Sequence, residues 1–291
     1  MKLSVVIPCL NAAETLAQQL TALQQNDWPD WEVIIADNGS TDGTQGIALG
    51  FADTLNLRVT DASQHAGAGY ARNVGATQTT GDALLFIDAD DEVDPNWLEH
   101  MGHALMQHEF VAAQLEYHKL NKDWVYHSRG RPQEKELARH RHGESLPYAF
   151  SASLGIKRDL HDAINGFDTR FEIGEDMDYC WRAQAQGVSL EFVHDAVIHY
   201  RFRDTFAGIY RQARQYAQSN VHLYKHYHKL HRGGEVPVVP PKPTLSLKQI
   251  AYLLLRYPRI QDNKERGSWM WNLGWQMGIL QGAWRYRVMP F

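Results

Sequence analysis

The chain has 291 residues, of which 44% are hydrophobic, enough for one large domain or for a catalytic domain with a smaller appendage. Its formal net charge of -5 argues against a general nucleic-acid binder, because such proteins carry a basic excess. The two cysteines, Cys9 and Cys180, lie far apart in apolar stretches, so no disulfide framework is expected and a reducing compartment fits better.

No stretch approaches the roughly 18 apolar residues of a membrane span. The N-terminal run from Leu3 to Pro8 is too short for the core of a signal peptide and contains a proline, so it indicates a strand. The sequence therefore predicts a cytoplasmic protein, and association with the inner face of a membrane stays open.

The first hundred residues alternate between short apolar runs and helical patterns. Strands are predicted at Leu3 to Leu10, Trp31 to Ala36, Leu57 to Thr60 and Ala83 to Ile87, and helices at Ala12 to Gln25, Thr44 to Phe51 and Ala68 to Thr79. This alternation predicts a mostly parallel sheet covered by helices on both faces. Ligands bind beyond the carboxyl ends of such strands, where the sequence places Asn11, Asp37 and Asp88-Ala89-Asp90.

The rest of the chain divides into an irregular middle and a helical end. Residues 121–144 are polar, rich in Arg and His and poor in apolar anchors, which predicts a long mobile loop or lid. The elements expected after it are a strand-to-turn segment at Ser151 to Arg158, a helix at Asp176 to Gln186, a strand at Leu190 to Tyr200, and helices at Thr205 to Lys229, Leu245 to Arg256 and Ser268 to Arg285.

Asp88-Ala89-Asp90 is the strongest chemical feature. Two carboxylates two residues apart after a buried strand can hold Mg²⁺ or Mn²⁺ beside a diphosphate, since hard cations prefer oxygen ligands. Such a metal would neutralise charge on a departing nucleoside diphosphate. The alternative is a solvated turn, because Asp94-Pro95 begins a helix nearby.

Two further segments suit a nucleotide. Asp37 can accept the ring N–H of uracil, thymine or guanine, which favours a UDP, dTDP or GDP donor. It also fits an ordinary strand-to-helix turn. The helix opening at Ala68 could meet phosphate at its N-terminus, and the guanidinium of Arg72 could reach ribose or pyrophosphate. Arg72 stands where a dinucleotide-binding motif would have its third glycine, which counts against that alternative.

Acidic and imidazole groups appear again after residue 170. Asp176, preceded by Glu175, could deprotonate an incoming hydroxyl as a general base. Both residues also suit an acidic helix start. His199 ends a predicted strand and could complete a metal shell, although most of the 15 histidines must have ordinary roles.

Taken in order, five segments resemble the glycosyltransferase family 2 enzymes, which have the Rossmann-like GT-A fold. The segments are Val5-Val6-Ile7-Pro8-Cys9-Leu10-Asn11, Asp37-Asn38-Gly39-Ser40-Thr41-Asp42-Gly43-Thr44, Ala71-Arg72-Asn73-Val74-Gly75, Phe86-Ile87-Asp88-Ala89-Asp90-Asp91, and Gly166-Phe167-Asp168 followed by Gly174-Glu175-Asp176-Met177-Asp178-Tyr179-Cys180-Trp181-Arg182. The resemblance covers about residues 3–200. Asn165 and Cys9 depart from residues common in the family, at peripheral positions.

The resemblance implies an inverting transferase that uses Mn²⁺ or Mg²⁺ and a nucleotide-sugar donor. It implies a catalytic domain over residues 1–203, with the nucleotide side at about 1–110 and the acceptor side at about 111–203, and a helical region at 204–291. The implied roles are donor binding for Pro8, Asn11, Asp37, Arg72, Asp88 and Ala89, metal ligation for Asp90 and His199, and catalysis for the base Asp176 with Glu175 beside it.

The acceptor implied by this resemblance is a glycan or a lipid-linked glycan, in cell-envelope or polysaccharide synthesis, with no role for nucleic acid. A nucleotidyltransferase on the same fold would need a phosphate loop rich in Gly and Lys, which Pro8-Cys9-Leu10-Asn11 does not provide. The other alternative is a catalytically degenerate module that binds nucleotide or carbohydrate. The retention of Asp37, Asp88, Asp90 and Asp176 together argues against it.

The last predicted helix carries an apolar stripe, made of Met270, Leu273, Met277, Leu280 and Trp284, beside a second stripe with Trp271, Trp275, Gly278 and Gly282. A broad apolar face is usually buried, so packing against the catalytic domain or another subunit is the favoured interpretation. An interfacial helix that meets a lipid-linked acceptor at a membrane is the alternative. The C-terminal helices could also support a homodimer.

Overall fold

A computed structural model describes residues 1–140, 146–233 and 240–290. The chain divides into two compact units. The first unit comprises Met1–Glu116, Pro132–Ala138 and Pro147–Tyr200, and the second comprises Tyr117–Arg131, Arg139–Leu146 and Arg201–Phe291. Among the described residues, no helix combines the length and the apolar character needed to cross a membrane. Both cysteines are buried free thiols, as the sequence predicted.

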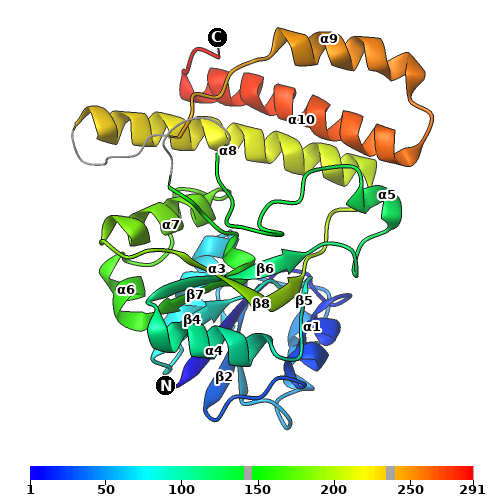
Figure 1. Cartoon of the computed structure of the whole chain (residues 1–291). Helices are drawn as coiled ribbons and strands as arrows, with labels where there is room; N and C mark the ends of the chain where they lie inside the picture. Colours follow the sequence, from blue (N-terminus) through cyan, green and yellow to red (C-terminus); the bar gives the residue numbers. More distant parts are fainter. Residues whose placement is uncertain (141–145, 234–239, 291) are drawn as a thin grey trace. The chain divides into compact units, whose positions relative to one another are not determined.

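An eight-stranded sheet forms the centre of the first unit, in the order β3-β2-β1-β4-β7-β6-β8-β5 (Figure 1). Only β7 and β5 run against the other six strands, which confirms the predicted mostly parallel sheet. The strands are β1 (Leu3–Cys9), β2 (Trp31–Asp37), β3 (Leu57–Asp61), β4 (Ala83–Phe86), β5 (Glu92–Val93), β6 (Phe110–Glu116), β7 (Leu154–Lys157) and β8 (Glu191–His199).

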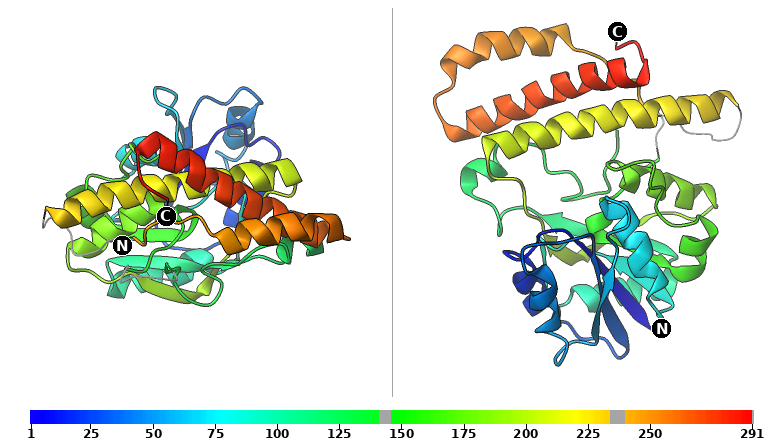
Figure 2. Two further views of the ribbon diagram at one scale, coloured as in Figure 1. Left: turned by 90° about the horizontal axis from the view of Figure 1, so that it is seen from above. Right: turned by 180° about the vertical axis from the view of Figure 1, so that it is seen from behind.

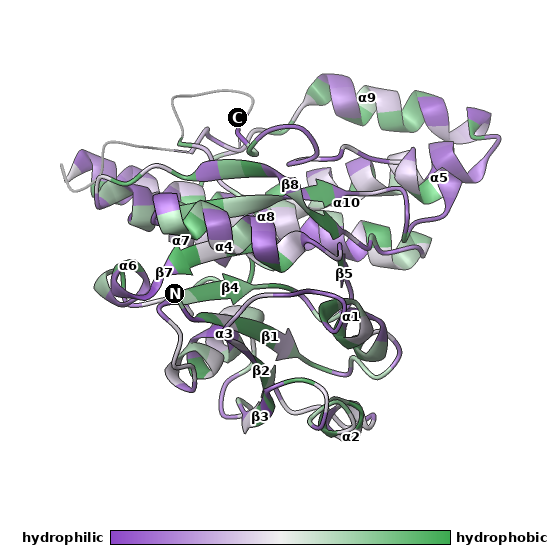
Figure 3. Ribbon diagram, turned by 60° about the horizontal axis from the view of Figure 1, so that its bottom comes forward, coloured by the Kyte–Doolittle hydropathy of each residue, from purple (hydrophilic) through white to green (hydrophobic). Residues whose placement is uncertain are grey.

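Helices cover both faces of this sheet, which explains why β1, β2 and β4 are hydrophobic along their length (Figure 3). The helices of the unit are α1 (Leu16–Leu23), α2 (Thr44–Leu49), α3 (Ala68–Thr77), α4 (Trp97–Gln107), α6 (Arg158–Ala163) and α7 (Glu175–Ala185), and Ser151–Ser153 forms a short 3₁₀ turn. The first helix begins at Leu16 instead of the predicted Ala12. The N–H groups of Ala12 and Ala13 are already bonded to the side chains of Thr44 and Asp42.

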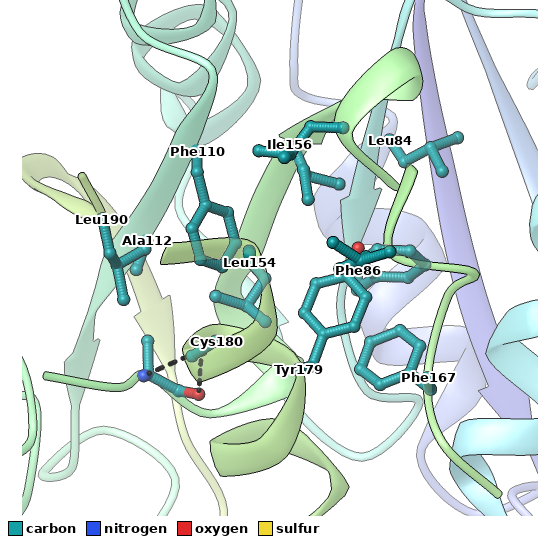
Figure 4. Close-up of a cluster of buried hydrophobic side chains, with 14 of the residues drawn as sticks. Leu84, Phe86, Phe110, Ala112, Leu154, Ile156, Phe167, Tyr179, Cys180 and Leu190 are labelled. Atoms are coloured by element: carbon teal, nitrogen blue, oxygen red, sulfur yellow. Dashed lines mark hydrogen bonds between the residues drawn. The ribbon is translucent and has the colours of Figure 1, made fainter. Parts of the chain in front are cut away.

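Alternate residues of the central strands face opposite helical layers. Phe86 of β4 belongs to a buried cluster with Phe167 and Tyr179, whose rings stack 4.1 Å apart between centroids (Figure 4). On the other face, Gly155 of β7 leaves room for Met101 of α4. The sheet is therefore held between α3 and α7 on one side and α4 on the other.

Residues 121–140 are mostly irregular, as predicted for a long loop, but they contain one short helix and buried side chains. They include the short helix α5 (Asp123–Tyr126), and Val125 is fully buried. Gln133 has a φ of +62° and is 2% exposed; its amide donates to the Ala113 carbonyl and to Ser153 Oγ, 2.7 and 2.6 Å away. The predicted long loop is thus present with a buried polar anchor, its role as a mobile lid stays a prediction, and residues 141–145 of it lie outside the described residues.

The second unit contains three long helices, α8 (Phe206–Arg232), α9 (Leu247–Arg256) and α10 (Asn263–Tyr286), with the 3₁₀ turn Tyr257–Arg259 after α9 (Figure 2). The pair α8 and α10 packs closely through glycines of α10. A Cβ on Gly274 or Gly278 would collide with the backbone carbonyls of Tyr210 and Arg214 in α8.

The packed face of α10 is therefore the stripe that contains Gly278 and Gly282. It is not the predicted stripe that ends at Leu280 and Trp284, which are 42% and 87% exposed within the chain. Small residues allow a closer helix contact than large apolar ones, so glycine spacing outweighed hydrophobicity in selecting this face.

Candidate active site

The carboxyl ends of β1 and β2 are joined by hydrogen bonds through Asn11. Its backbone has a φ of +50°, and its N–H donates to Ser40 Oγ over 2.9 Å. In the other direction, Asn11 Oδ1 accepts the Thr41 N–H, also at 2.9 Å. This exchange fixes the turn after β2 against the end of β1, where Pro8 is paired with Ala36 in the sheet.

Asp37 ends β2 and is 1% exposed. Its carboxylate accepts the side-chain amide of Gln45 at 2.6 Å and the Ser40 N–H at 3.2 Å. These donors fix the orientation of the carboxylate, and its two oxygens retain lone pairs that can accept a further N–H. The geometry thus suits the predicted base-recognition role, which stays a prediction.

Three carboxylates gather just after β4. One oxygen from each of Asp88, Asp90 and Asp91 can be chosen so that all three lie within 4.8 Å of one another. The loop that carries them is held by the buried Gln19 of α1, whose amide donates to the Asp88 carbonyl and whose oxygen accepts the Val93 N–H, both at 3.0 Å. An all-oxygen donor set of this kind fits Mg²⁺ or Mn²⁺.

Asp91 is the functional candidate that sequence reasoning missed, because only the Asp-x-Asp spacing was weighed. Its adjacency to Asp90 was the available signal. Asp91 is 1% exposed, and Ala89, predicted to touch the donor, is 6% exposed between the two other aspartates. Like charges disfavour one another at short range, and a divalent cation would offset the charge of three neighbouring carboxylates.

Arg72 of α3 connects this aspartate group to α7. It is 2% exposed; its Nη2 donates to Asp88 Oδ1 at 2.6 Å and its Nη1 donates to Glu175 Oε1 at 3.0 Å. Its guanidinium carbon also lies 5.5 Å from the centre of the Phe167 ring. Both Nη groups are therefore engaged by carboxylates, and a contact of Arg72 with ribose or phosphate stays a prediction.

Glu175 and Asp176 form the first turn of α7, which follows Gly174 in a left-handed conformation. Asp176 is half-buried, and its Oδ1 accepts the Met177 N–H at 2.8 Å. Burial, followed by the neighbouring charge of Glu175, raises the pKa of Asp176 to about 7. Burial also raises the pKa of Glu175, against the opposing charge of Arg72. A carboxyl group with a pKa near neutrality is suited to general-base chemistry.

His199 ends β8 and lies outside the group formed by the three aspartates. Its Nδ1 is 2.8 Å from Glu116 Oε2, and its Nε2 is 3.9 Å from Asp94 Oδ2. The structure thus brings Arg72, Asp88 and Glu175 into direct contact and places His199 among other carboxylates. Metal ligation by His199 stays a prediction.

Known proteins resemble this chain in sequence. Residues 4–164 match the sequence model of Glycosyl transferase family 2. The glycosyltransferase AglE of Haloferax volcanii is 31% identical over 67% of this chain and 65% of its own length. The poly(ribitol-phosphate) beta-N-acetylglucosaminyltransferase TarS of Staphylococcus aureus is 32% identical over 37% of this chain. The chain spans 65% of AglE and only 19% of TarS.

Solved structures share the fold of this chain. Residues 1–349 of Staphylococcus aureus TarS in complex with UDP-GlcNAc align with a TM-score of 0.59 at 18% identity, over 99% of this chain and 92% of that one. The mannosyltransferase PcManGT from Pyrobaculum calidifontis, in complex with GDP-Man and Mn²⁺, aligns with a TM-score of 0.58 over 97% and 75% of the two chains. The GT-A fold predicted from the sequence is confirmed, and the chain belongs to glycosyl transferase family 2.

Proposed function

We propose that the chain is an inverting glycosyltransferase that moves a sugar from a nucleoside-diphosphate sugar to an acceptor hydroxyl, with Mn²⁺ or Mg²⁺ bound by the aspartate group. The observation that carries the proposal is the continuous contact from Asp88 through Arg72 to Glu175, beside Asp176. This contact joins residues suited to a metal and diphosphate to a carboxyl group suited to a proton transfer. Such proximity is what a direct displacement needs.

The proposed reaction assigns one task to each end of this contact. Asp176 accepts the proton of the acceptor hydroxyl while the hydroxyl oxygen attacks C1 of the sugar, and the bond from C1 to the diphosphate oxygen breaks on the opposite side. Asp88, Asp90 and Asp91 would hold the divalent cation, which supplies Lewis-acid stabilisation of the departing diphosphate. Glu175, held by Arg72, orients the start of α7.

The donor is proposed to be UDP-linked, with dTDP and GDP as alternatives. A carboxylate at Asp37 can accept the ring N–H of uracil, thymine or guanine. The two structural relatives named above hold UDP-GlcNAc and GDP-Man, so this fold accommodates both kinds of base. We further propose a glycan or lipid-linked glycan as the acceptor, in cell-envelope or polysaccharide synthesis, because poly-beta-1,6-N-acetyl-D-glucosamine synthase of Staphylococcus epidermidis is also a relative.

Calorimetry with UDP and GDP tests the proposal, in Mn²⁺, in Mg²⁺ and in EDTA. We expect metal-dependent binding that Asp90→Ala abolishes, because a metal ligand is lost, and that Asp176→Asn preserves, because the base is needed only for turnover. Ligand at 100 times its dissociation constant should also stabilise the fold by about 2.7 kcal/mol. Asp53→Ala, at an exposed aspartate after α2, is the matched control and should bind like the wild type.

The outcomes separate the proposal from its rival. Absence of binding by either nucleotide under every metal condition would remove the basis of the transferase assignment. Binding without turnover on any acceptor or on water would favour a degenerate nucleotide-binding or carbohydrate-binding module. A homodimer through the C-terminal helices and peripheral membrane association stay predictions.

A further inference from the structure

One face of α9 is apolar and exposed within its own unit. Leu247, Leu254 and Leu255 are 74%, 72% and 64% exposed, and the exposed Ala251 lies between them on the same side of the helix. Their spacing of i, i+4, i+7 and i+8 makes a continuous stripe over about two and a half turns. Hydrophobic and hydrophilic residues alternate along this helix (Figure 3). This set of four residues is called the α9 stripe below.

The opposite side of α9 packs on α10, so the orientation of the helix is fixed. Leu253 is the buried residue of α9, and its carbonyl accepts the Trp269 Nε1–H at 2.9 Å. Gln249, one turn earlier, accepts a hydrogen bond from the side-chain amide of Gln276. Arg256, near the end of the helix, forms an ion pair with Glu265 of α10. These contacts turn the α9 stripe away from α10.

The charge around the α9 stripe is positive. Lys248 lies within α9 and Arg259 just after it, both exposed, and the sequence from Lys242 to Gln261 contains neither Asp nor Glu, with Asp262 the first acidic residue after it. The imbalance extends over the whole C-terminal part of the chain. Residues 201–291 hold 15 Lys and Arg against 4 Asp and Glu, whereas residues 1–200 hold 14 against 30.

We propose that the α9 stripe docks on the surface of a lipid bilayer that contains anionic headgroups. A short amphipathic helix with exposed leucines, flanking Lys and Arg, and aromatic side chains such as Tyr252 has the composition of an interfacial helix. The leucines enter the boundary between headgroups and acyl chains, while Lys248 and Arg259 meet anionic lipid. This inference does not depend on the transferase activity.

The charge pattern favours lipid over a second copy of the chain. A two-fold contact between two α9 stripes would bring Lys248 and Arg259 of both copies together, and such like charges repel. Anionic lipid neutralises the same side chains. The sequence had offered the last helix, α10, as an alternative interfacial element; α10 packs its glycine face on α8 and holds α9 with another side, while its Leu280 and Trp284 stay exposed.

Flotation of the full chain with vesicles tests the proposal. We expect recovery with vesicles of phosphatidylcholine mixed with about 30% phosphatidylglycerol, and much less with phosphatidylcholine alone, because the basic residues need anionic lipid. The double variant Leu254→Gln/Leu255→Gln should lower the partition coefficient at least about tenfold, through loss of the inserted apolar surface. Both leucines are exposed, so the fold should tolerate the change.

A matched control uses two exposed apolar residues of the first unit, Leu49 (59% exposed) and Met106 (62% exposed). Leu49→Gln/Met106→Gln should bind vesicles like the wild type. Failure of the wild type to float with anionic vesicles overturns the proposal, as does equal binding by both double variants. A dimer that dissociates only in Leu254→Gln/Leu255→Gln, without vesicle binding, would assign the α9 stripe to a second copy. Nucleotide calorimetry on the same variants reports separately on the proposed function.

Discussion

Glu175 and Asp176 are adjacent carboxyl groups at the start of α7 with different partners. Glu175 accepts a hydrogen bond from the buried guanidinium of Arg72, whereas Asp176 accepts the Met177 N–H and lies next to the charge of Glu175. Groups whose environments separate their pKa values can take different roles in one site. The proposed function accordingly assigns an orienting role to Glu175 and the proton-accepting role to Asp176.

The raised pKa of Asp176 predicts a pH-dependent stability. The folded chain holds this proton up to a pH of about 7, against an ordinary value of 3.8, so the stabilisation present in acid is lost as pH rises from about 4 to 7. Asp176→Asn removes this loss. Measured in EDTA, the free energy of unfolding of the variant relative to the wild type should rise by at least about 1 kcal/mol between pH 5 and pH 8.

Asp61→Asn is the control for this measurement. Hydrogen bonds from Ser63 lower the pKa of the exposed Asp61, so it is ionised in both folded and unfolded chains throughout pH 5 to 8. Its difference from the wild type should stay flat across that range. If the free energy of unfolding of Asp176→Asn relative to the wild type is also independent of pH, burial does not hold the proton on Asp176. The argument for a general base with a pKa near neutrality would then fail.

At the residue scale, the sequence predicted where polar groups collect but not which groups touch. Asn11, Asp37 and Asp88 were expected at strand ends because that position depends only on strand periodicity. The double contact of Arg72 with Asp88 and Glu175 joins residues 103 positions apart in sequence, and local patterns contain no information on such a pair. The anchoring of Gln133 was missed for the same reason.

At the element scale, the contact of α8 with α10 depends on glycines in a helix. Gly278→Ala would place a Cβ against the Arg214 carbonyl and the Ala217 Cβ, so the helices must separate. We expect a loss of about 1–3 kcal/mol of stability, although alanine is the better helix former by about 1 kcal/mol. Urea denaturation followed by tryptophan fluorescence measures this loss, since α10 contains four tryptophans.

The matched substitution is Gly46→Ala in α2, where no atom lies within 4 Å of the added Cβ. It should stabilise the chain by up to about 1 kcal/mol, because only helix propensity changes. If Gly278→Ala were as stabilising as Gly46→Ala, then α10 could not pack on α8 as closely as described.

Element types were predicted well where one periodicity dominated. The four strands and three helices of the first 90 residues were found within a few residues of their predicted bounds. The start of the first helix was predicted four residues too early, at Ala12, because apolar periodicity alone does not mark a helix N-terminus. Within the chain, α10 packs on α8 through its glycines and not through the more hydrophobic stripe, because glycines allow the closer helix contact; packing of that stripe on another subunit stays a prediction.

At the scale of the whole molecule, the net charge of -5 is the sum of an acidic region and a basic region. Taken as a single value it argued against a general nucleic-acid binder, yet residues 201–291 carry 15 Lys and Arg against 4 Asp and Glu. At moderate salt, electrostatic attraction to a surface depends mainly on charges within about 10 Å of it. The net charge of the whole chain is less important. A chain of this kind can bind an anionic surface above its isoelectric point.

Ion-exchange chromatography at pH 8 and low salt tests this reasoning. The sequence has an isoelectric point near 6.3, so a uniformly charged chain would pass through a cation exchanger at that pH. We expect retention instead, through the basic C-terminal region. Lys248→Glu should elute at lower salt than the wild type, whereas Lys135→Glu, an equal change at an exposed lysine of the first unit, should elute with it. If the wild type passes through the column without retention, its basic residues form no accessible anion-binding surface. The charge of this region would then no longer favour anionic lipid as the partner of the α9 stripe.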